Sequence, residues 1–480
     1  MKKFVLPLIM VSFLFSSTFL YVNAKTDNIK NDKANVNAKT NNSNGKADPN
    51  AKSNNGNNGK TNSNPKSNNN ADVDSNPNSD NNDNISNTIV YLQERLLVDN
   101  PINPSQALEN FLNNCSNKKV VFPSNKTFVL ERQLVIHHVE NIEIDFNGCT
   151  IKLPDNLSWN KTRYDTGAYV PLAAITVHDS KNITFKNYTI DGNSPNIDPE
   201  QWYIGLWLSN INGFSSVNGS FKYCNYHHIV IYPGTKDINF VGTYFKDHGG
   251  ASNPAGISDV YVANSPEDNF SFIDTTVDNT ALRERQAQCF YISGYNGLID
   301  TVHANNCSIP LDVRKGTHIA KNFTINNAEL MLMIQPNPIN STEFANLTAS
   351  NFTGINIQGK SNGGAAGVYI VGCEKVHLNN FVINMDPAAE YSWYGIRIRK
   401  FYDAYPVKDV VISDIEISNP RVSSLMFQYL VDSVSVNNIK SVNAPYAIRE
   451  DYCTINQYVE NLSLVNSKEL HPISNMIVIN

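Results

Sequence analysis

The chain has 480 residues, a formal net charge of -6 at pH 7 and 7 cysteines. This charge gives no reason to propose a nucleic-acid partner, and the cysteine spacings match no zinc-binding pattern. Because an odd number of cysteines cannot all pair within one chain, we expect at least one thiol to be left over.

The first 24 residues have two lysines, an apolar run and the small-residue pattern Val22-Asn23-Ala24. This order is typical of a secretory signal peptide that is cleaved before Lys25. The apolar run is shorter than a spanning helix needs, and no second run of that length follows. We therefore predict a secreted, extracellular protein that has no membrane partner after cleavage.

Residues 25–86 consist mainly of Asn, Lys, Ser, Asp and Gly, with almost no aliphatic or aromatic side chains. Such a segment cannot offset the entropy cost of ordering, so we predict a disordered linker. No similar change in composition interrupts residues 87–480. This part is therefore expected to form one continuous domain.

A short template recurs within residues 87–480, as in ITFKNYTI and VHLNNFVI. Its apolar residues alternate as in a β-strand, and its fifth position holds Asn, Asp or Gly, which tolerate a left-handed corner. Successive copies lie roughly 20 to 40 residues apart, which predicts a solenoid of parallel coils. The expected corner residues are Gly148, Asn187, Asn218, Gly242, Asp274, Asn306, Asn327, Asn351, Asn380, Asp414, Asn438 and Asn466.

A second strand recurs later in each coil, as in GLWLSN, HIVIYPG and CFYISG. If its alternate aliphatic residues point inward, the residues between them face solvent. His228 and Asp259 fall two residues before this outer column. The column is expected to hold Trp207, Val230, Tyr261, Tyr291, Asp312, Met333, Tyr369, Arg397 and Arg449. A neighbouring column is expected to hold Ser209, Tyr232, Ala263, Ser293, Arg314, Gln335, Val371 and Arg399.

The stretch before the coils, PSQALENFLNNCSNKKVVFPSNKTFVLERQLVI, has an amphipathic segment followed by a strand and a Pro-turn-aromatic element. With the coils, it resembles the opening of the pectate-lyase-like superfamily. Arg285 and Gln286, just before one of the recurring strands, are similar to an Arg-Gln pair of bacterial and phage members. The resemblance implies an all-β fold, a right-handed parallel β-helix that forms a single-stranded solenoid with an N-terminal capping helix.

The resemblance also implies a polysaccharide lyase, a polygalacturonase-type glycoside hydrolase or a uronan epimerase, with substrate along the outer face of one sheet. Several motifs of these enzymes are absent, including the Asn-Thr-Asp and Gly-His-Gly blocks of polygalacturonases and the Asp-Pro-His-Asp block of alginate epimerases. The calcium-binding carboxylates of pectate lyases are missing too. We expect no metal or other cofactor, with Ca²⁺ possible only if the protein is a lyase.

The outer columns combine aromatic rings with charges, a mixture that grips sugars by their apolar faces and their hydroxyl or carboxylate groups. Strand propensity alone also favours large side chains on a sheet, and a solvated face also explains the arginines. The expected substrate-binding residues are Trp207, Tyr232, Tyr261, Arg285, Lys315, Tyr369, Arg397 and Arg399.

Asp312 is the first choice for catalysis, because a carboxylate is unfavourable on a central strand. Asp259 lies two coils earlier, roughly 10 Å along the stack, whereas inverting hydrolysis uses carboxyl groups roughly 6.5 to 9.5 Å apart. In a hydrolase one of the two would protonate the leaving oxygen while the other activates water, and Tyr291 and His228 would orient the sugar.

In a lyase, Arg314, Lys315 or Arg285 would neutralise the uronate carboxylate, and Tyr291 or His228 would act as acid or base. The excess of arginine in the later coils favours an anionic polymer. We therefore expect a secreted carbohydrate-active enzyme that cleaves glycosidic bonds of an extracellular polysaccharide. The alternative is a non-catalytic, glycan-binding or adhesin-type β-helix. The sequence leaves the exact sugar, the disulfide pairing and the oligomeric state open.

Overall fold

The computed structural model describes residues 88–92, 104–157, 172–198, 201–248, 258–282, 288–336, 343–360, 364–400, 407–430, 434–453, 457–470 and 477–479. The expected signal peptide, the whole of the expected linker and Arg285 lie outside these residues. The chain divides into two units, residues 1–80 and 81–480, and the predicted coils belong to the second. Among the described residues, no helix is long and apolar enough to cross a membrane.

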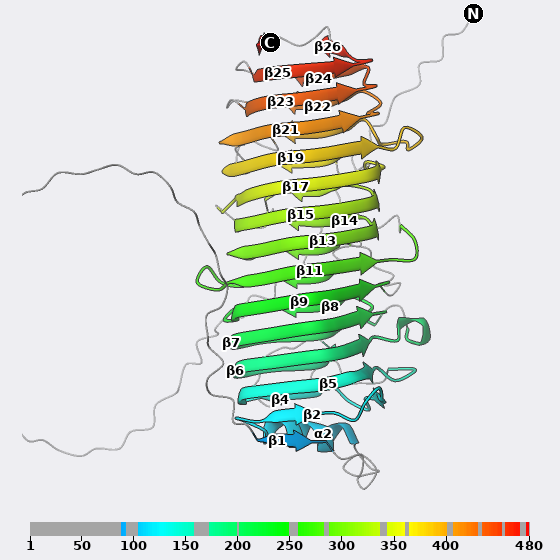
Figure 1. Cartoon of the computed structure of the whole chain (residues 1–480), viewed down its shortest axis with the longest axis vertical. Helices are drawn as coiled ribbons and strands as arrows, with labels where there is room; N and C mark the ends of the chain where they lie inside the picture. The colour runs from blue at the N-terminus through cyan, green and yellow to red at the C-terminus, as the bar shows by residue number, and fades with distance from the viewer. Residues whose placement is uncertain are drawn as a thin grey trace, which may run out of the picture. The chain divides into compact units, whose positions relative to one another are not determined.

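The second unit is a parallel β-helix, in which each coil contributes one long and one short strand (Figure 1). Every pairing between its strands is parallel, as in β11–β13 and β12–β14, so the predicted fold is confirmed. The long strands are β5 (Glu140–Lys152), β6 (Leu172–Asp191), β7 (Tyr203–Lys222), β9 (Lys236–Lys246), β11 (Phe270–Asp278), β13 (Gly297–Cys307), β15 (Gly316–Ala328), β17 (Ala345–Ile357), β19 (Lys375–Met385), β21 (Val410–Ser418), β23 (Val434–Val442) and β25 (Tyr458–Val465). The three-residue strand β27 (Ile477–Ile479) pairs with β25 in the same ladder.

The short strands form the second ladder, which β6 and β7 join to the first because they run through both. They are β4 (Leu134–His137), β8 (His227–Ile231), β10 (Ser258–Val262), β12 (Gln288–Ile292), β14 (Ile309–Val313), β16 (Leu332–Ile334), β18 (Ala366–Val371), β20 (Tyr394–Arg399), β22 (Ser423–Gln428), β24 (Tyr446–Asp451) and β26 (Lys468–Leu470). A 3-10 turn, η1 (Ser194–Asn196), lies between β6 and β7.

The N-terminal end carries the helix α2 (Pro104–Asn113) with the short strands β1 (Ile89–Tyr91), β2 (Lys119–Val121) and β3 (Thr127–Val129). Leu108 and Leu112, one turn apart, are buried, and Phe111 packs against the same core. The helix therefore covers the apolar end of the first coil, which would otherwise contact water. The predicted capping helix is confirmed.

A left-handed corner interrupts the long strands from β6 to β25 at the same register, as the template predicted. Asn351 is typical: its φ is 59°, it donates to Asn322 at 2.9 Å, and Asn380 donates to it at 2.9 Å. Such a ladder satisfies polar groups along the stack of corners. In register the column holds Asn187, Asn218, Gly242, Asp274, Thr301, Asn322, Asn351, Asn380, Asp414, Asn438 and Asn461.

Three expected corner residues were assigned to the wrong column. Thr301, Asn322 and Asn461 occupy the places given to Asn306, Asn327 and Asn466. Asn306, Asn327 and Asn466 also have positive φ, but they lie at a second left-handed corner later in the coil. There Asn327 donates a hydrogen bond to Asn306 at 2.6 Å. The template failed because both corners of the coil favour asparagine.

Apolar side chains from both ladders fill the interior of the coils. Phe323, Phe352 and Phe381 stack in register, with ring centroids 4.3 and 4.6 Å apart. One disulfide, Cys289–Cys307, crosses the interior, and the other five cysteines have free thiols. The thiol predicted to be left over is therefore one of five.

Alternation of side chains breaks down at the start of the short strands β8 and β12. We number each short strand from its residue in the outer column, which is position 0, so that His227 is at position -3 and Tyr261 at position 0 of the next coil. His227 stacks on Tyr261, so positions -3 and 0 share the outer face. His228, at position -2, instead stacks on the core residue Phe245. The side chains at positions -3 and 0 of these strands therefore point out of the β-helix, and those at positions -2 and -1 point into it. Strict alternation does not predict this order.

Candidate functional site

The outer column of the short strands is in the register that the sequence predicted. Residues Tyr261, Tyr291 and Asp312 pair in successive coils, and the column also includes Met426, which the sequence pattern did not reveal. The prediction that the column faces solvent was wrong for many of its members, because neighbouring side chains bury them. Those with less than a tenth of their surface exposed are Trp207, Val230, Asp312, Met333, Tyr369 and Met426.

Asp312 is the best-defined polar residue of the column, and it is 0% exposed. Its Oδ2 accepts hydrogen bonds from Gln288 Nε2 and from Arg314 Nη2, both at 2.7 Å. Its Oδ1 has no hydrogen-bond partner among the described residues. When the side-chain amide of Gln335 is oriented with its oxygen toward Arg314, that oxygen accepts a hydrogen bond from Arg314 Nη1 at 2.7 Å. Asp312 is thus fixed through one oxygen only.

Burial raises the pKa of Asp312 above its ordinary value, although the charge of Arg314 acts in the opposite direction. The raised pKa favours the neutral carboxylic acid at higher pH than for an exposed aspartate. Because Oδ2 already accepts two hydrogen bonds, the proton of the neutral acid belongs on Oδ1. A carboxyl group in this state can donate a proton to a ligand that reaches Oδ1.

A continuous stack of rings extends from this carboxyl group across the earlier coils. Arg314 lies 4.9 Å from the centroid of Tyr291, whose ring stacks on Tyr261 at 5.4 Å. Tyr261 stacks on His227 at 5.3 Å, and the His227 ring is 3.8 Å from that of Tyr226. Tyr291, Tyr261, Arg314 and Asp312 are therefore the sequence-predicted residues that the structure brings together. We call this group, with His227 and Tyr226, the ring stack.

The remaining predicted binding residues form separate groups along the same sheet. Trp207 and Tyr232 contact each other at 4.9 Å, and Tyr232 is 41% exposed. Arg397 lies 5.7 Å from the Tyr369 ring, and Arg399 lies 5.8 Å from the ring of Tyr429. These contacts place aromatic groups before the ring stack, and both aromatic and cationic groups after it.

Lys315 does not face the ring stack. Its ammonium group lies 4.6 Å from the centroid of the Tyr295 ring and 3.6 Å from a carboxylate oxygen of Glu343. This arrangement gives no support to the predicted role of Lys315 in neutralising a uronate carboxylate in a lyase. Arg285, the third predicted cation, lies outside the described residues.

His228 and Asp259 lie inside the β-helix, not on its outer face. His228 is 0% exposed and Asp259 is 1% exposed. A hydrogen bond of 2.7 Å joins His228 Nδ1 and Asp259 Oδ1. Burial lowers the pKa of His228 to about 4. For Asp259, burial acts to raise the pKa, but His248 and His228 lower it below its ordinary value. The predicted pairing of Asp259 with Asp312, and of His228 with the sugar, is therefore wrong in geometry.

Sequence reasoning missed residues on the outer face that come from position -3 or from the turns. Gln288 and His227 are at position -3, and only the broken alternation at the strand start reveals them. A second carboxylate, Glu329, pairs with Lys360 at 2.7 Å and accepts a hydrogen bond from Ser308. The charge of Lys360 also acts to lower the pKa of Asp312.

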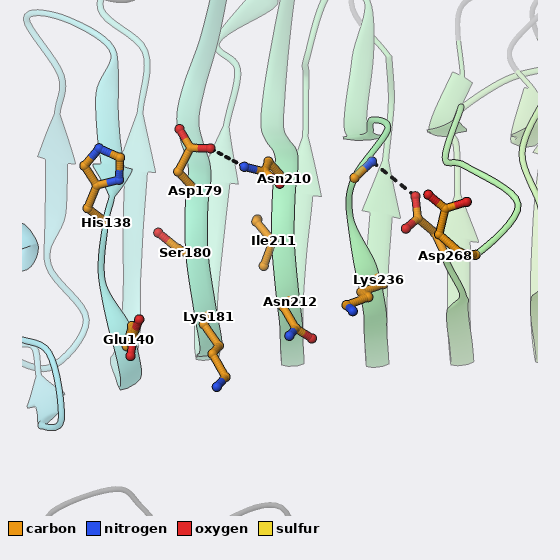
Figure 2. Close-up of a pocket in the computed structure, with 12 residues that line it drawn as sticks. His138, Glu140, Asp179, Ser180, Lys181, Asn210, Ile211, Asn212, Lys236 and Asp268 are labelled. Atoms are coloured by element: carbon orange, nitrogen blue, oxygen red, sulfur yellow. Dashed lines mark hydrogen bonds between the residues drawn. The ribbon is translucent and has the colours of Figure 1, made fainter. Parts of the chain in front are cut away.

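A hollow of about 610 Å³ lies at the corner that follows the first short strands. Figure 2 shows Asp179 and Asn210 hydrogen-bonded across neighbouring coils, with Lys181, Lys236 and Asp268 around them. None of the residues predicted from the sequence lines this hollow. The candidate site is therefore a stretch of sheet surface and not this hollow.

No family model and no curated protein matches the chain. Among solved structures, it is similar to PfbA, a surface adhesin of Streptococcus pneumoniae, with 13% identity, a TM-score of 0.47 and coverage of 81% of this chain and 96% of that chain. It is also similar to an endo-xylogalacturonan hydrolase from Aspergillus tubingensis, with 14% identity, a TM-score of 0.44 and coverage of 82% and 99%.

A third similar structure is a polygalacturonase from Erwinia carotovora ssp. carotovora, with 15% identity, a TM-score of 0.40 and coverage of 82% and 96%. Enzymes and adhesins therefore both occur among the similar structures. At these identities and TM-scores, the likenesses assign neither a substrate nor an activity to this chain.

Proposed function

We propose that this chain is a secreted carbohydrate-active enzyme that cleaves glycosidic bonds in an anionic extracellular polysaccharide. The observation that carries the proposal is Asp312, a buried carboxyl group with one fixed and one unpartnered oxygen at the end of the ring stack. Such a group is suited to general acid catalysis, because its neutral form persists at higher pH.

The polymer would lie across the coils, along the axis of the short-strand sheet. Sugar rings present apolar C–H faces, which pack on aromatic rings such as Tyr261 and Tyr232. Arg314, Arg397 and Arg399 would bind the carboxylate or sulfate groups of an anionic chain, because guanidinium groups form charge-assisted, bidentate hydrogen bonds with such oxygens. Rings and cations occur together in three groups along the face, which suits an extended ligand.

At the centre of this face, Asp312 Oδ1 would protonate the leaving glycosidic oxygen while Gln288 and Arg314 hold Oδ2. Arg314 is thereby a positioning residue for Asp312 as well as a cation for the substrate. Glu329, which pairs with Lys360, replaces Asp259 as the candidate second carboxylate in a hydrolase. In a lyase, Arg314 would instead neutralise the uronate carboxylate.

A second function, non-catalytic glycan binding, is favoured by one specific observation. Asp312 is 0% exposed, so a substrate must first gain access to Oδ1 before any proton transfer, whereas Tyr232 is 41% exposed and Tyr429 is 42% exposed. An adhesin needs only these accessible rings and their neighbouring cations. The two functions differ in whether the bound polymer is cut.

The test is to incubate the purified protein with a panel of acidic and neutral polysaccharides. New reducing ends are measured together with the ultraviolet absorbance of unsaturated uronate. Reducing ends with that absorbance indicate a lyase, and reducing ends alone indicate a hydrolase. Binding of an acidic polymer without either signal would contradict the enzyme and favour the adhesin. If Asp312 is the acid, the rate should fall as pH rises through its raised pKa, since only the protonated form donates.

A further inference from the structure

His228, Asp259 and His248 form a buried cluster that the proposed function does not use. His228 Nδ1 lies 2.7 Å from Asp259 Oδ1, and His248 Nε2 lies 2.9 Å from the same oxygen. The two imidazoles stack with centroids 4.6 Å apart, and no residue of the three is more than 3% exposed. Two ring nitrogens from different parts of the coil therefore converge on one point inside the β-helix.

The cluster occupies the same corner of the coil as the disulfide, two coils earlier. Ile229, Val260 and Phe290 pair in register, so the residues just before them, His228, Asp259 and Cys289, are equivalent in successive coils. Phe245, Val277 and Ala304 also pair in register. His248 and Cys307 each lie three residues beyond this column, so His228 and His248 correspond to Cys289 and Cys307.

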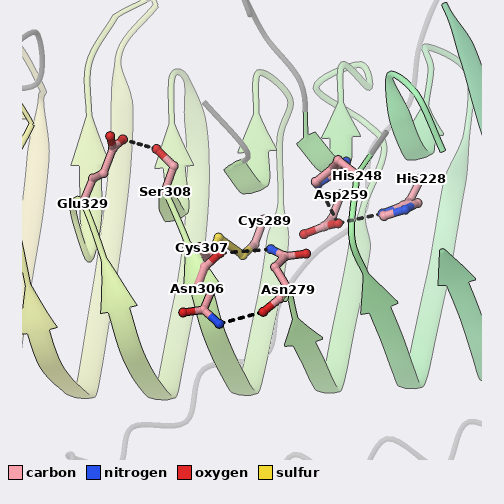
Figure 3. The surroundings of a disulfide bond; sticks show 9 residues. All are labelled: His228, His248, Asp259, Asn279, Cys289, Asn306, Cys307, Ser308 and Glu329. Atoms are coloured by element: carbon pink, nitrogen blue, oxygen red, sulfur yellow. Dashed lines mark hydrogen bonds and ion pairs between the residues drawn. A yellow bond between two sulfur atoms is a disulfide. The ribbon is translucent and has the colours of Figure 1, made fainter. Parts of the chain in front are cut away.

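This correspondence shows that the corner accepts a cross-link between the start of a short strand and the end of the following long strand. In one coil the link is the Cys289–Cys307 disulfide. Figure 3 shows His228 and His248 near Asp259 at the equivalent place, with the disulfide close by along the stack. The intervening coil supplies Asp259, so the histidine pair is joined by a carboxylate.

Hydrogen bonds within the cluster do not account for all of its polar atoms. His228 Nε2, His248 Nδ1 and Asp259 Oδ2 are buried and have no hydrogen-bond partner among the described residues. If both imidazoles are neutral, no cation among the described residues contacts the carboxylate to compensate its charge. Burying such a charge is costly, and a divalent cation between the three side chains would offset it.

We propose that His228, Asp259 and His248 bind a divalent transition-metal ion, Zn²⁺ being the one that their chemistry fits best. The three ligand atoms lie within 4.8 Å of one another. Zn²⁺ accepts two imidazole nitrogens and a carboxylate oxygen at about 2.0 to 2.2 Å, usually in tetrahedral geometry. Small shifts of the side chains separate the nitrogens and the oxygen enough to hold the ion, with a water molecule as fourth ligand. The ion would cross-link neighbouring coils, as the disulfide does.

The test is the metal content of the full chain after unfolding with a chelator and refolding with Zn²⁺ or Co²⁺. Wild type should retain about one ion per chain after dialysis, and Co²⁺ should give the visible absorption of a nitrogen and oxygen site. His248→Ala and Asp259→Asn should each retain less than a tenth of that amount. His377→Ala, which removes a partly exposed histidine on the long-strand ladder, serves as the control and should bind like wild type.

Three results would overturn the proposal. Folded wild type that holds no ion after refolding with either metal would leave a purely hydrogen-bonded cluster. Retention of the ion by His248→Ala would place it elsewhere. A strong thiolate-to-cobalt absorption band would assign it to the free cysteines. If the variants fail to fold, the wild-type stoichiometry and spectrum decide alone, and chelation should lower the Tm of wild type. Neither readout depends on polysaccharide cleavage.

Discussion

The two ladders of the β-helix differ in how regularly one residue type repeats along a column of equivalent positions. In the long strands, Asn322, Asn351 and Asn380 repeat one residue type at one corner, and the rings of Phe323, Phe352 and Phe381 repeat below them. The outer face of the short strands instead changes residue type from coil to coil. Repetition in the long strands stabilises the stack of coils. A residue that differs in type from the rest of its column marks a place with a separate role.

Asp312, on the outer face of the short-strand ladder, and Asp259, on its inner face, illustrate this difference. Each carboxylate stands in a column whose neighbours do not repeat it, and each is fixed by partners from adjacent coils. Asp312 is held on the outer face beside a cation, whereas Asp259 is held inside between two imidazoles. Substitutions in the two ladders should therefore separate the stabilising role of the repeated residues from the binding role of the ring stack.

The largest expected effect on stability is at the phenylalanine stack under the long strands. Phe352→Ala should lower the free energy of unfolding by about 3 to 5 kcal/mol, because it removes a fully buried ring and leaves a cavity. Urea unfolding followed by circular dichroism measures the change. Val382→Ala, a 38% exposed position on β19, is the control and should cost less than about 1 kcal/mol. Equal losses would contradict the packing role of the stack.

A smaller effect is expected at His318, near the corner between the short and long strands. Its Nδ1 accepts from Gly297 N–H at 3.1 Å, and its Nε2 donates to the Lys315 carbonyl at 2.7 Å, which only the neutral ring can do. Burial lowers the pKa of His318 from 6.5 to about 4. Because the unfolded chain then takes up the proton first, stability present above pH 6.5 is lost as pH falls toward 4.

The loss at His318 should be on the order of 3 kcal/mol between pH 7 and pH 4. His318→Gln keeps a donor and an acceptor but does not titrate, so its unfolding free energy should fall less over this range. Urea unfolding of both proteins at the two pH values measures the difference. An identical pH dependence would show that His318 does not contribute to acid sensitivity.

At the asparagine corner, Asn351→Ala should cost about 2 kcal/mol. Alanine in the left-handed conformation is strained, and the hydrogen bonds to Asn322 and Asn380 are lost. Asn351→Gly removes the same hydrogen bonds without the strain and should cost less. Thermal and urea unfolding compare the two variants. A greater loss in the glycine variant would indicate that conformation is not what selects asparagine here.

The smallest expected effect is on ligand binding by the ring stack. Tyr261→Ala should weaken affinity for the bound polysaccharide about fivefold, or about 1 kcal/mol, because one stacking surface is lost. Affinity electrophoresis or calorimetry on the polymer that wild type binds gives the ratio. Tyr244→Ala, on the long strand β9, should leave affinity unchanged. If both variants bind equally, the ligand does not lie on the short-strand face.

The fold and the outer column were predictable because each coil contributes one residue to each column. That regularity is visible in the sequence and correctly places Tyr261, Tyr291 and Asp312 in adjacent coils. It fails at the strand starts, where His227 turns outward and His228 inward. No pattern of apolar residues signals this change of direction, so the proposed metal ligands His228 and Asp259 were mistaken for surface residues.

Contacts between the ends of different strands and turns were also beyond the sequence. The pairing of Cys289 with Cys307 and of Glu329 with Lys360 depends on where the ends of neighbouring strands meet. Spacing along the chain does not encode that position, because the segments between strands vary in length. The corner residues show the same limit, since Asn306 fits the template in the sequence but lies at another corner, whereas Thr301, which does not fit it, occupies the expected place.

The most direct test of the proposed function compares two Asp-to-Asn variants on the polysaccharide that wild type binds. Asp312→Asn removes the proposed acid, whereas Asp274→Asn changes an exposed corner residue whose column mostly holds asparagine. Cleavage by Asp312→Asn should fall at least about a hundredfold with affinity little changed, and Asp274→Asn should cleave like wild type. Equal cleavage by both variants, or no cleavage by wild type of any polymer that it binds, would contradict catalysis at Asp312.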